Sequence, residues 1–223
     1  AAMTDADLGG TVIKVERPGH GDGARYLQPL KHGKSAYFAA VNRGKKSIVL
    51  DFDDAGDRDV LERLVGRADV LLENFRPRVL ARFGLDWESV HTRYPALIYG
   101  SVTGYGQTGP DARRPAYDTV IQARGGLMGM TGLAGGPPVR AGSSVGDLAA
   151  GMFLTQGVLA ALYDRAHTGL GRRVDVAMLD AQVALLEQAV AATAVTGQSP
   201  GPTGTRHTAI APCEAVASAD APF

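Results

Sequence analysis

The sequence predicts an α/β protein with an open parallel sheet, and three observations lead to this prediction. Short β-rich runs alternate with helical patterns over most of the chain. One unit joins a strand at Ser47–Asp51, a helix at Ala55–Gly66 and a strand at Asp69–Glu73, a length that suits a right-handed crossover between parallel strands. Glycine makes up 29 of 223 residues, which fits many tight turns. We therefore expect ligands at the carboxyl ends of the strands.

The other elements follow from local signals. The chain opens like the end of a helix stopped at Gly9-Gly10, and a strand is expected at Thr11–Glu16 because β-branched residues dominate it. Pro77 fits a helix's first turn and Gly84 its end. Further helices are expected at 87–94, 117–130 (loosened by two glycines), 148–166 and 177–193, and further strands at 96–101 and 172–176.

The domain organisation is expected to be incomplete in this sequence. Residues 1–196 are predicted to form one domain, and 197–223 to be a Gly/Pro/Thr-rich linker with the beginning of a second, smaller domain. Because the chain opens on a helix remnant, the first strand of the sheet is also expected to be missing. We expect the isolated chain to be poorly soluble, since unpaired sheet edges and uncovered apolar surface promote association.

Composition excludes several classes of partner and site. The 23 Lys and Arg residues balance 23 Asp and Glu residues, so no global field attracts nucleic acid or an anionic membrane. A single cysteine, Cys213, excludes an internal disulfide and a cysteine-rich zinc site, which suits a cytoplasmic protein. The five histidines are widely spaced, so no metal site is expected. We find neither a signal peptide nor an apolar run of 18 residues.

Asp147 stands where a turn-rich segment meets the long apolar helix. As an N-cap its carboxylate would accept the first free backbone N–H groups, and the helix dipole would favour its ionised form. Two interpretations stay open at this point. Asp147 is only a cap, or it is a nucleophile that forms an acyl intermediate, since the glycines around it let a substrate approach.

Two glycine motifs offer alternatives. Gly142–Gly146 fits G-x-S-x-G with Ser144 as the nucleophile of an α/β-hydrolase, and Asp180 and His207 follow in the required order. The expected helix start at Asp147, three residues after the serine, and the linker around His207 weaken that interpretation. Gly104–Gly109 fits G-x-G-x-x-G, but a proline-rich loop follows it where a dinucleotide site needs a helix, so we expect a flexible active-site loop.

A basic segment follows the strand predicted at Asp69–Glu73. It carries Arg76, Arg78 and Arg82. Because ligands bind at the carboxyl ends of strands in open α/β sheets, these arginines suggest an anion. A solvated basic helix face is the alternative.

Several segments, taken together and in order, resemble the family III coenzyme A transferases, also called the CaiB/BaiF family. The resemblance covers nearly the whole chain, and no single motif carries it. The matching stretches are Val12–Gly19, Asn42–Asp51, Ala68–Pro77, Gly104–Pro110, Arg114–Asp118 and Gly169–Val176.

The resemblance implies a large Rossmann-like domain, a smaller second domain and two ring-like chains interlocked as a homodimer. It implies that Asp147 is the nucleophile and that Tyr117 and Asp118 lie beside the reacting thioester. It also implies a coenzyme A site, lined by Arg17, Leu50, Asn74, Phe75 and Arg82. Family members begin with a strand and a glycine-containing loop that lie outside this sequence.

The sequence thus predicts an enzyme that moves coenzyme A from an acyl-CoA thioester to a free carboxylic acid through an acyl intermediate on Asp147. No tightly bound cofactor is expected; acyl-CoA is the substrate. The main alternative is an α-methylacyl-CoA racemase of the same family, in which the aspartate acts as a base and a histidine stands where Tyr117 stands here. A hydrolase using Ser144 and a non-catalytic CoA-binding protein are the remaining alternatives.

Overall fold

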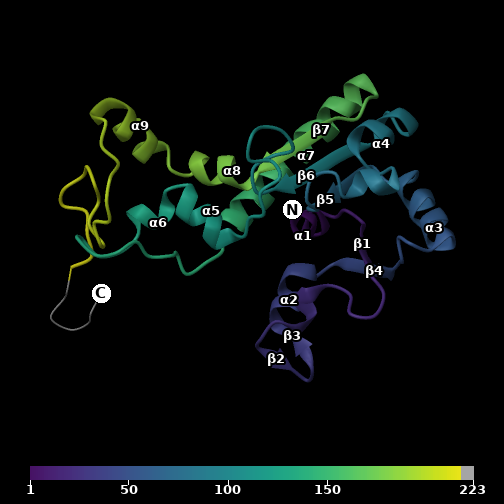
Figure 1. Ribbon diagram of the computed structural model, residues 1–223, viewed down its shortest axis with the longest axis horizontal. Helices are drawn as coiled ribbons and strands as arrows, with labels where there is room; N and C mark the ends of the chain where they lie inside the picture. Colours follow the sequence, from purple (N-terminus) through teal and green to yellow (C-terminus); the bar gives the residue numbers. More distant parts are fainter. Residues whose placement is uncertain (217–223) are drawn as a thin grey trace. The chain divides into compact units, whose positions relative to one another are not determined.

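The computed structural model describes residues 1–216, and these form two compact units. One unit contains residues 1–101 and 151–175, and the other contains residues 102–150 and the chain from 176 onward. Figure 1 labels the helices and strands of both units. The predicted division at residue 196 stays a prediction.

The first unit has three kinds of element in chain order. Its helices are α1 (Ala2–Asp7), α2 (Ala36–Asn42), α3 (Ala55–Val65) and α4 (Trp87–Arg93), with 3-10 turns η1 (Gly23–Tyr26) and η2 (Leu80–Phe83). Its strands are β1 (Val12–Glu16), β2 (Leu30–Lys31), β3 (Lys34–Ser35), β4 (Lys45–Val49) and β5 (Val70–Glu73). Three further elements contribute residues to both units, namely β6 (Ile98–Thr103), α7 (Val145–Thr168) and β7 (Arg173–Ala177).

Parallel pairing is confirmed, but the two strands of the predicted crossover unit, β4 and β5, belong to different sheets. β1 lies parallel to β4 with Val15 opposite Ile48, and β5 lies parallel to β6 with Glu73 opposite Ser101. β6 also pairs with β7, and the three strands run side by side in Figure 1. Among the described residues, no ladder joins β4 to β5, although α3 connects them. A crossover helix indicates only that its two strands share a direction, whereas tertiary packing decides which strands become neighbours.

Helix α7 packs on the sheet through two close approaches of small residues. At Gly100 of β6, an added Cβ would lie 3.0 Å from Leu154 Cδ1 of α7. At Gly157 of α7, an added Cβ would lie 2.5 Å from Val174 Cγ1 of β7. Larger side chains at either glycine would push the helix away from the strands. The other side of this unit has a core in which α3, α4 and η2 surround Leu50 and Tyr99.

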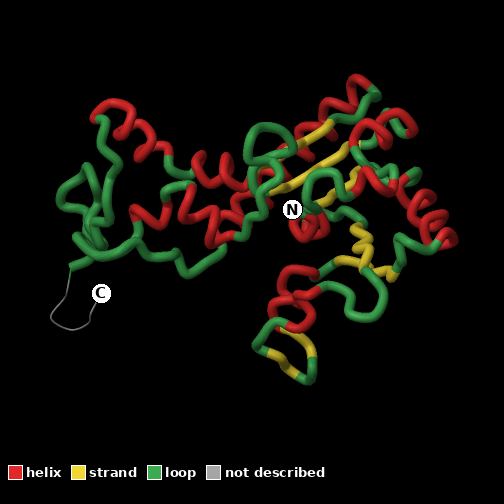
Figure 2. Tube along the Cα trace, viewed as in Figure 1, coloured by secondary structure: helices red, strands yellow, loops and turns green. Residues whose placement is uncertain are grey.

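The second unit is mainly helical in its described part. Its own helices are α5 (Asp118–Arg124), α6 (Leu127–Met130), α8 (Met178–Ala184) and α9 (Glu187–Thr196). The helix expected over 117–130, predicted to be loosened by its paired glycines, is in fact divided by them into α5 and α6, and Gly126 takes a positive φ of 94°. The helix expected over 177–193 is wrong as one element, because Leu185 and Leu186 interrupt it between α8 and α9. Figure 2 shows the loop at this break.

Two more local predictions differ from the structure. Helix α2 was not predicted; its signal is Ser35, whose Oγ accepts a hydrogen bond from the backbone N–H of Phe38 at 3.1 Å. The helix expected from Pro77 is a shorter 3-10 turn that begins at Leu80 and ends at Gly84, which has φ 64°. The start of a second domain, expected at the end of the segment 197–223, falls mostly outside the described residues.

By length and composition, α7 could cross a membrane, with a mean hydropathy of 1.5 over its best window. The core helix of a soluble protein passes the same test, and 39% of that window is buried inside the protein. Buried residues of α7 include Ala150, Leu154 and Val158. Its apolar character therefore matches its packing on β6 and β7.

Candidate active site

Asp147 lies in the first turn of α7, and its predicted role as N-cap is wrong. The helix begins at Val145, and the first helical bond runs from the backbone N–H of Leu148 to the carbonyl of Ser144 at 3.0 Å. Asp147 is thus the third residue of the helix, and it is exposed. Val145-Gly146 is a weak helix-forming pair, which hid the true start from sequence inspection.

Asp118, the first residue of α5, accepts the backbone hydrogen bond at the start of α7 that was expected of Asp147. Its Oδ1 accepts a hydrogen bond from the backbone N–H of Gly146 at 2.9 Å, so it satisfies a free donor in the first turn of α7. Its Oδ2 accepts from Gln122 Nε2 at 2.8 Å and from Arg140 Nη2 at 3.0 Å. Asp118 is 7% exposed. A buried carboxylate with three donors is tightly held beside the helix that carries Asp147.

Arg140 closes the turn that leads into α7. Its guanidinium donates to Ser144 Oγ and to the carbonyl of Gly142, both at 3.3 Å, in addition to its ion pair with Asp118. Arg140 therefore neutralises the buried carboxylate and at the same time bridges to the turn before the helix.

The pKa of Asp147 is raised above its ordinary value. Loss of hydration beside the protein is the main cause, and the negative charge of Asp118 adds to it, while Arg140 opposes both. The predicted preference for the ionised form is therefore wrong in direction, because partial loss of hydration and a like charge outweigh the dipole of α7. A more basic carboxylate is also a better nucleophile, as long as it is ionised at the working pH.

Tyr117 stands at the start of α5 with its side chain 77% exposed. Its backbone carbonyl accepts hydrogen bonds from the N–H groups of Val120 and Ile121. Tyr117 and Asp118 are adjacent, yet the first side chain lies open to solvent and the second is buried under α7. The structure therefore brings Asp118 and Asp147 to one helix end and leaves the phenol of Tyr117 free to meet a ligand.

Ser144 is closer to the helix start than predicted. It directly precedes α7, so the three-residue offset that weakened the hydrolase interpretation is wrong. The segment before it is not a strand, however, and its hydroxyl contacts the Arg140 guanidinium, which cannot serve as a general base. His207 Nδ1 accepts hydrogen bonds from the backbone N–H groups of Ala209 and Ile210. The contact with Arg140 thus gives Ser144 a local structural role, whereas the His207 ring is bonded within its own segment.

The residues expected to bind coenzyme A all belong to the first unit, at or after strand ends. Arg17 follows β1, is exposed and donates to the carbonyl of Gly21 at 3.3 Å. Leu50 follows β4, but its side chain is 4% exposed and lies in the hydrophobic core. Its backbone N–H donates to the carbonyl of Glu16 at 2.9 Å, which joins the ends of β1 and β4. The Leu50 side chain thus belongs to the core, and its expected contact with coenzyme A stays a prediction.

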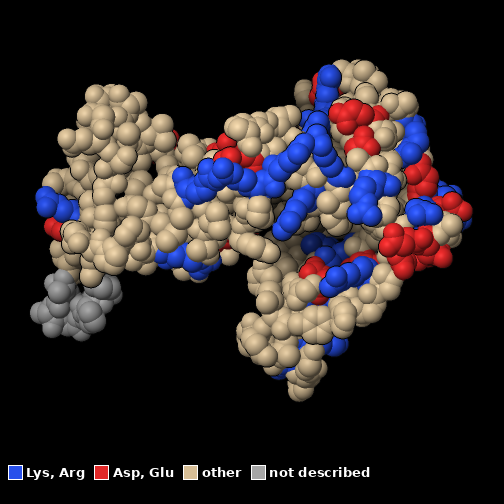
Figure 3. Space-filling view, in the orientation of Figure 1, with Lys and Arg blue, Asp and Glu red and all other residues tan. Residues whose placement is uncertain are grey.

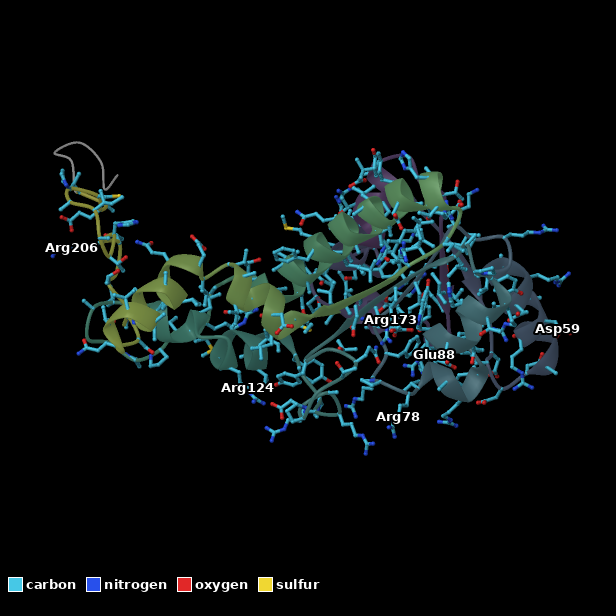
Figure 4. The ribbon with its side chains drawn as sticks, turned by 90° about the horizontal axis from the view of Figure 1, so that it is seen from above. Asp59, Arg78, Glu88, Arg124, Arg173 and Arg206 are labelled. Carbon is cyan, nitrogen blue, oxygen red and sulfur yellow. The ribbon has the colours of Figure 1, made fainter. Side chains whose placement is uncertain are left out.

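Asn74 and Phe75 follow β5 directly and are exposed, as is Arg82 in η2. Figure 3 shows Lys and Arg side chains gathered near α4 and β5. In Figure 4, Arg78 extends away from the ribbon. The basic segment predicted to meet an anion is therefore available to solvent, as an anion site requires.

Sequence inspection missed a row of polar side chains across the three-stranded sheet. Glu73 of β5 lies opposite Ser101 of β6, and the Ser101 hydroxyl donates to Asp175 Oδ1 of β7 at 3.2 Å. Burial first, and then the charge of Asp175, raise the pKa of Glu73 to about 7. Glu73 Oε2 also accepts a hydrogen bond from the backbone N–H of Phe75 at 2.8 Å. The signal was an acidic residue at the end of an otherwise apolar strand.

The G-x-G-x-x-G segment is a loop, as predicted. It follows β6, and the next helix begins only at Asp118. Gly106 and Gly109 have φ values of 79° and 91°, which a side chain would strain. In the described part of the chain, no group of three or more His, Cys, Asp or Glu residues could hold a metal ion.

Comparison with known proteins identifies the family. The model of CoA-transferase family III matches residues 1–223. The acetyl-CoA:oxalate CoA-transferase of Acetobacter aceti is 47% identical over 97% of this chain and 56% of its own length. The succinyl-CoA:glutarate CoA-transferase of Mus musculus is 42% identical over 99% of this chain and 51% of its own length. The chain thus spans about half the length of these relatives.

A solved structure agrees. A CaiB/BaiF family protein from Brucella suis superposes with a TM-score of 0.90 at 40% identity, covering 96% of this chain and 57% of the other. The α/β fold with parallel strand pairs and the match over the whole sequence lead to one conclusion: the chain belongs to CoA-transferase family III.

Proposed function

We propose that the protein transfers coenzyme A from an acyl-CoA thioester to a free carboxylic acid, with Asp147 as the covalent nucleophile. The observation that carries the proposal is the exposed Asp147 carboxylate in the first turn of α7, whose backbone is held by the buried Asp118. The similar proteins from Acetobacter aceti and Mus musculus are named as CoA-transferases between an acyl-CoA and an acid, which supports the same chemistry.

In the first half of the reaction, an oxygen of the Asp147 carboxylate attacks the thioester carbonyl. The C–S bond breaks, the CoA thiolate leaves with the electron pair, and a mixed anhydride forms on Asp147. The thiolate then attacks the Asp147 carbonyl, and the first acid departs as a carboxylate. The product is an aspartyl-CoA thioester.

The second half reverses these steps with the acceptor acid. Its carboxylate displaces the CoA thiolate from Asp147, and the thiolate then attacks the acceptor carbonyl. The new acyl-CoA departs and the Asp147 carboxylate is restored. Because each step exchanges one acyl bond for another, the reaction needs no net proton, oxidant or nucleotide.

The proposed coenzyme A contacts are Arg17, Asn74, Phe75 and Arg82, with Leu50 packed beneath them. Exposed guanidinium groups suit the phosphates, and the half-exposed Phe75 ring suits the adenine or the pantetheine arm. Tyr117 is proposed to meet the acyl group, since its phenol is open to solvent beside α5. No tightly bound cofactor takes part in the proposal.

Trapping with hydroxylamine tests the nucleophile. Hydroxylamine attacks an aspartyl anhydride or thioester at the enzyme carbonyl and leaves a hydroxamate on the protein, whereas a seryl ester returns unmodified serine. Protein treated with acyl-CoA and then hydroxylamine should carry the hydroxamate on the peptide that contains Asp147. Asp147→Asn should abolish turnover, and Ser144→Ala should retain most of it. The reverse ranking, without label on Asp147, would contradict the proposal.

A second experiment separates transfer from racemisation. A tyrosine hydroxyl ordinarily loses its proton only well above neutral pH, so Tyr117 suits a two-base proton exchange poorly. With 2-methylacyl-CoA in deuterated water, we expect no appreciable exchange at Cα. Rapid incorporation of deuterium would favour the racemase instead.

The proposal includes an interlocked homodimer in the cytoplasm. The family resemblance suggests this assembly, and exposed apolar side chains such as Met152 and Tyr163 on α7 offer surface that an assembly could bury. Sedimentation of the protein measures the assembly directly; a monomer with full transferase activity would contradict this part.

A further inference from the structure

Two glutamines are completely buried in the second unit, and their hydrogen bonding differs. Gln122 in α5 and Gln182 in α8 are both 0% exposed. Gln122 uses both ends of its amide in hydrogen bonds. Among the described residues, neither amide atom of Gln182 has a hydrogen-bond partner. The two glutamines are equally buried, but only the Gln122 amide forms hydrogen bonds within the described part of the chain. This difference indicates that Gln122 has a specific task, and Gln182 supplies a matched control.

The hydrogen-bond partners of Gln122 either belong to the turn before α7 or hold the first turn of α7, which carries Asp147. Its Nε2 donates to the carbonyl of Ser143 at 3.0 Å and to Asp118 Oδ2 at 2.8 Å. Its Oε1 accepts from the backbone N–H of Ala141 at 2.9 Å. One side chain thus ties two backbone groups of the turn before α7 to the carboxylate that holds the first turn of that helix.

This turn would be loose without such contacts. Residues 141–144 read Ala-Gly-Ser-Ser, form no regular secondary structure and contain exposed Gly142 and Ser143. Hydrogen bonds to a fully buried amide hold these backbone groups against the protein interior, so they do not depend on bonds to solvent. The position of Asp147, three residues further along the chain, therefore depends on the Gln122 amide.

We propose that Gln122 is a positioning residue for the Asp147 nucleophile, through its hydrogen bonds to Ala141, Ser143 and Asp118. The inference rests on the proposed transferase function. Attack on a thioester requires the reacting atoms about 3–3.5 Å apart, and a shift of about 1 Å can cost roughly a hundredfold in rate. The amide holds the attacking group in that geometry and does not touch the substrate.

The test compares Gln122→Met with Gln182→Met. Methionine fills a similar volume in both places but removes the amide. For Gln122→Met we expect kcat to fall by about 10- to 100-fold, with KM for acyl-CoA within about threefold, because the proposed CoA contacts belong to the other unit. Gln182→Met should keep kcat within about twofold and should not lower Tm, since it removes an unbonded amide.

A second variant gives a readout that folding alone does not supply. In Gln122→Glu, an ionised carboxylate would face two acceptors, Asp118 Oδ2 and the Ser143 carbonyl, whereas a protonated one can donate a single O–H bond. The kcat of Gln122→Glu relative to wild type, measured at each pH, should therefore rise as the pH is lowered. This readout also decides the matter if Gln122→Met fails to fold.

Three outcomes would overturn the inference: equal losses of kcat in the two methionine variants, a Gln122→Met change confined to KM, or a flat ratio of Gln122→Glu to wild-type kcat across pH. Failure of the proposed function looks different. In that case, hydroxylamine leaves no label on Asp147 in the wild-type protein, whatever the glutamine variants do.

Discussion

Replacing Glu16 by glutamine should remove a pH-dependent part of the stability of the β1–β4 pair. Glu16 is 5% exposed, and its carboxylate accepts two hydrogen bonds from Arg25 at 2.7 Å. It also accepts from Ser47 Oγ at 2.7 Å and from the backbone N–H of Asp22 at 3.0 Å. These contacts, with Arg25 first, lower the pKa of Glu16 from 4.5 to about 2 in spite of its burial.

The magnitude follows from linkage. A shift from 4.5 to about 2 corresponds to about 3 kcal/mol of stability. Because the Arg25 side chain is 40% exposed, solvent screens part of this, and we expect about 2 kcal/mol. Between these pKa values the unfolded chain binds more protons than the folded chain. The contribution is therefore complete above about pH 4.5 and disappears as the pH falls through about 2.

The assay is urea unfolding of wild type and Glu16→Gln at pH 7 and at a pH close to 2. The gap in unfolding free energy should be largest at pH 7 and should shrink by about 2 kcal/mol at the acid pH. Glu88→Gln is the control, since the Glu88 side chain is 76% exposed and its ion pair with Arg173 spans 3.9 Å; both residues are labelled in Figure 4. Its effect should stay below about 0.5 kcal/mol at both pH values. An unchanged gap for Glu16→Gln would refute the linkage argument.

Three further predictions concern single substitutions. Because the pKa of Glu73 is raised to about 7, its ionisation destabilises the folded chain as the pH rises from about 4.5 through 7. The free energy of unfolding of Glu73→Gln, relative to that of wild type, should therefore be about 1–2 kcal/mol higher at pH 8 than at pH 5 in urea unfolding. Arg17→Ala and Arg82→Ala should each raise KM for acyl-CoA about 10- to 100-fold with a smaller change in kcat, and steady-state kinetics with an unaltered KM would remove them from the site. Gly100→Ala should lower stability by about 1–3 kcal/mol in thermal melts, because its Cβ would lie 2.6 Å from Leu72 Cδ2.

The sequence by itself determined the α/β class, the parallel strands and most element positions. Those features are written in short-range patterns, such as the β-branched run of β1 and the paired glycines that end α5. Collinear motifs also indicated the family, because they extend over nearly the whole chain. The exposed Asp147 and the basic segment after β5 could be named as candidates for the same reason, since each follows a local boundary.

Only the tertiary structure decided which groups hold the start of α7, the helix that carries Asp147. Asp118 and Gln122 are distant in sequence from Gly146 and Ser143, yet they supply the hydrogen bonds at the start of α7. The upward shift in the pKa of Asp147 has the same origin, because it depends on partial loss of hydration and on a carboxylate 29 residues away. Strand neighbours likewise depend on packing. Local propensity fixes where an element begins, but desolvation and charge act through space, and only the folded chain defines those distances.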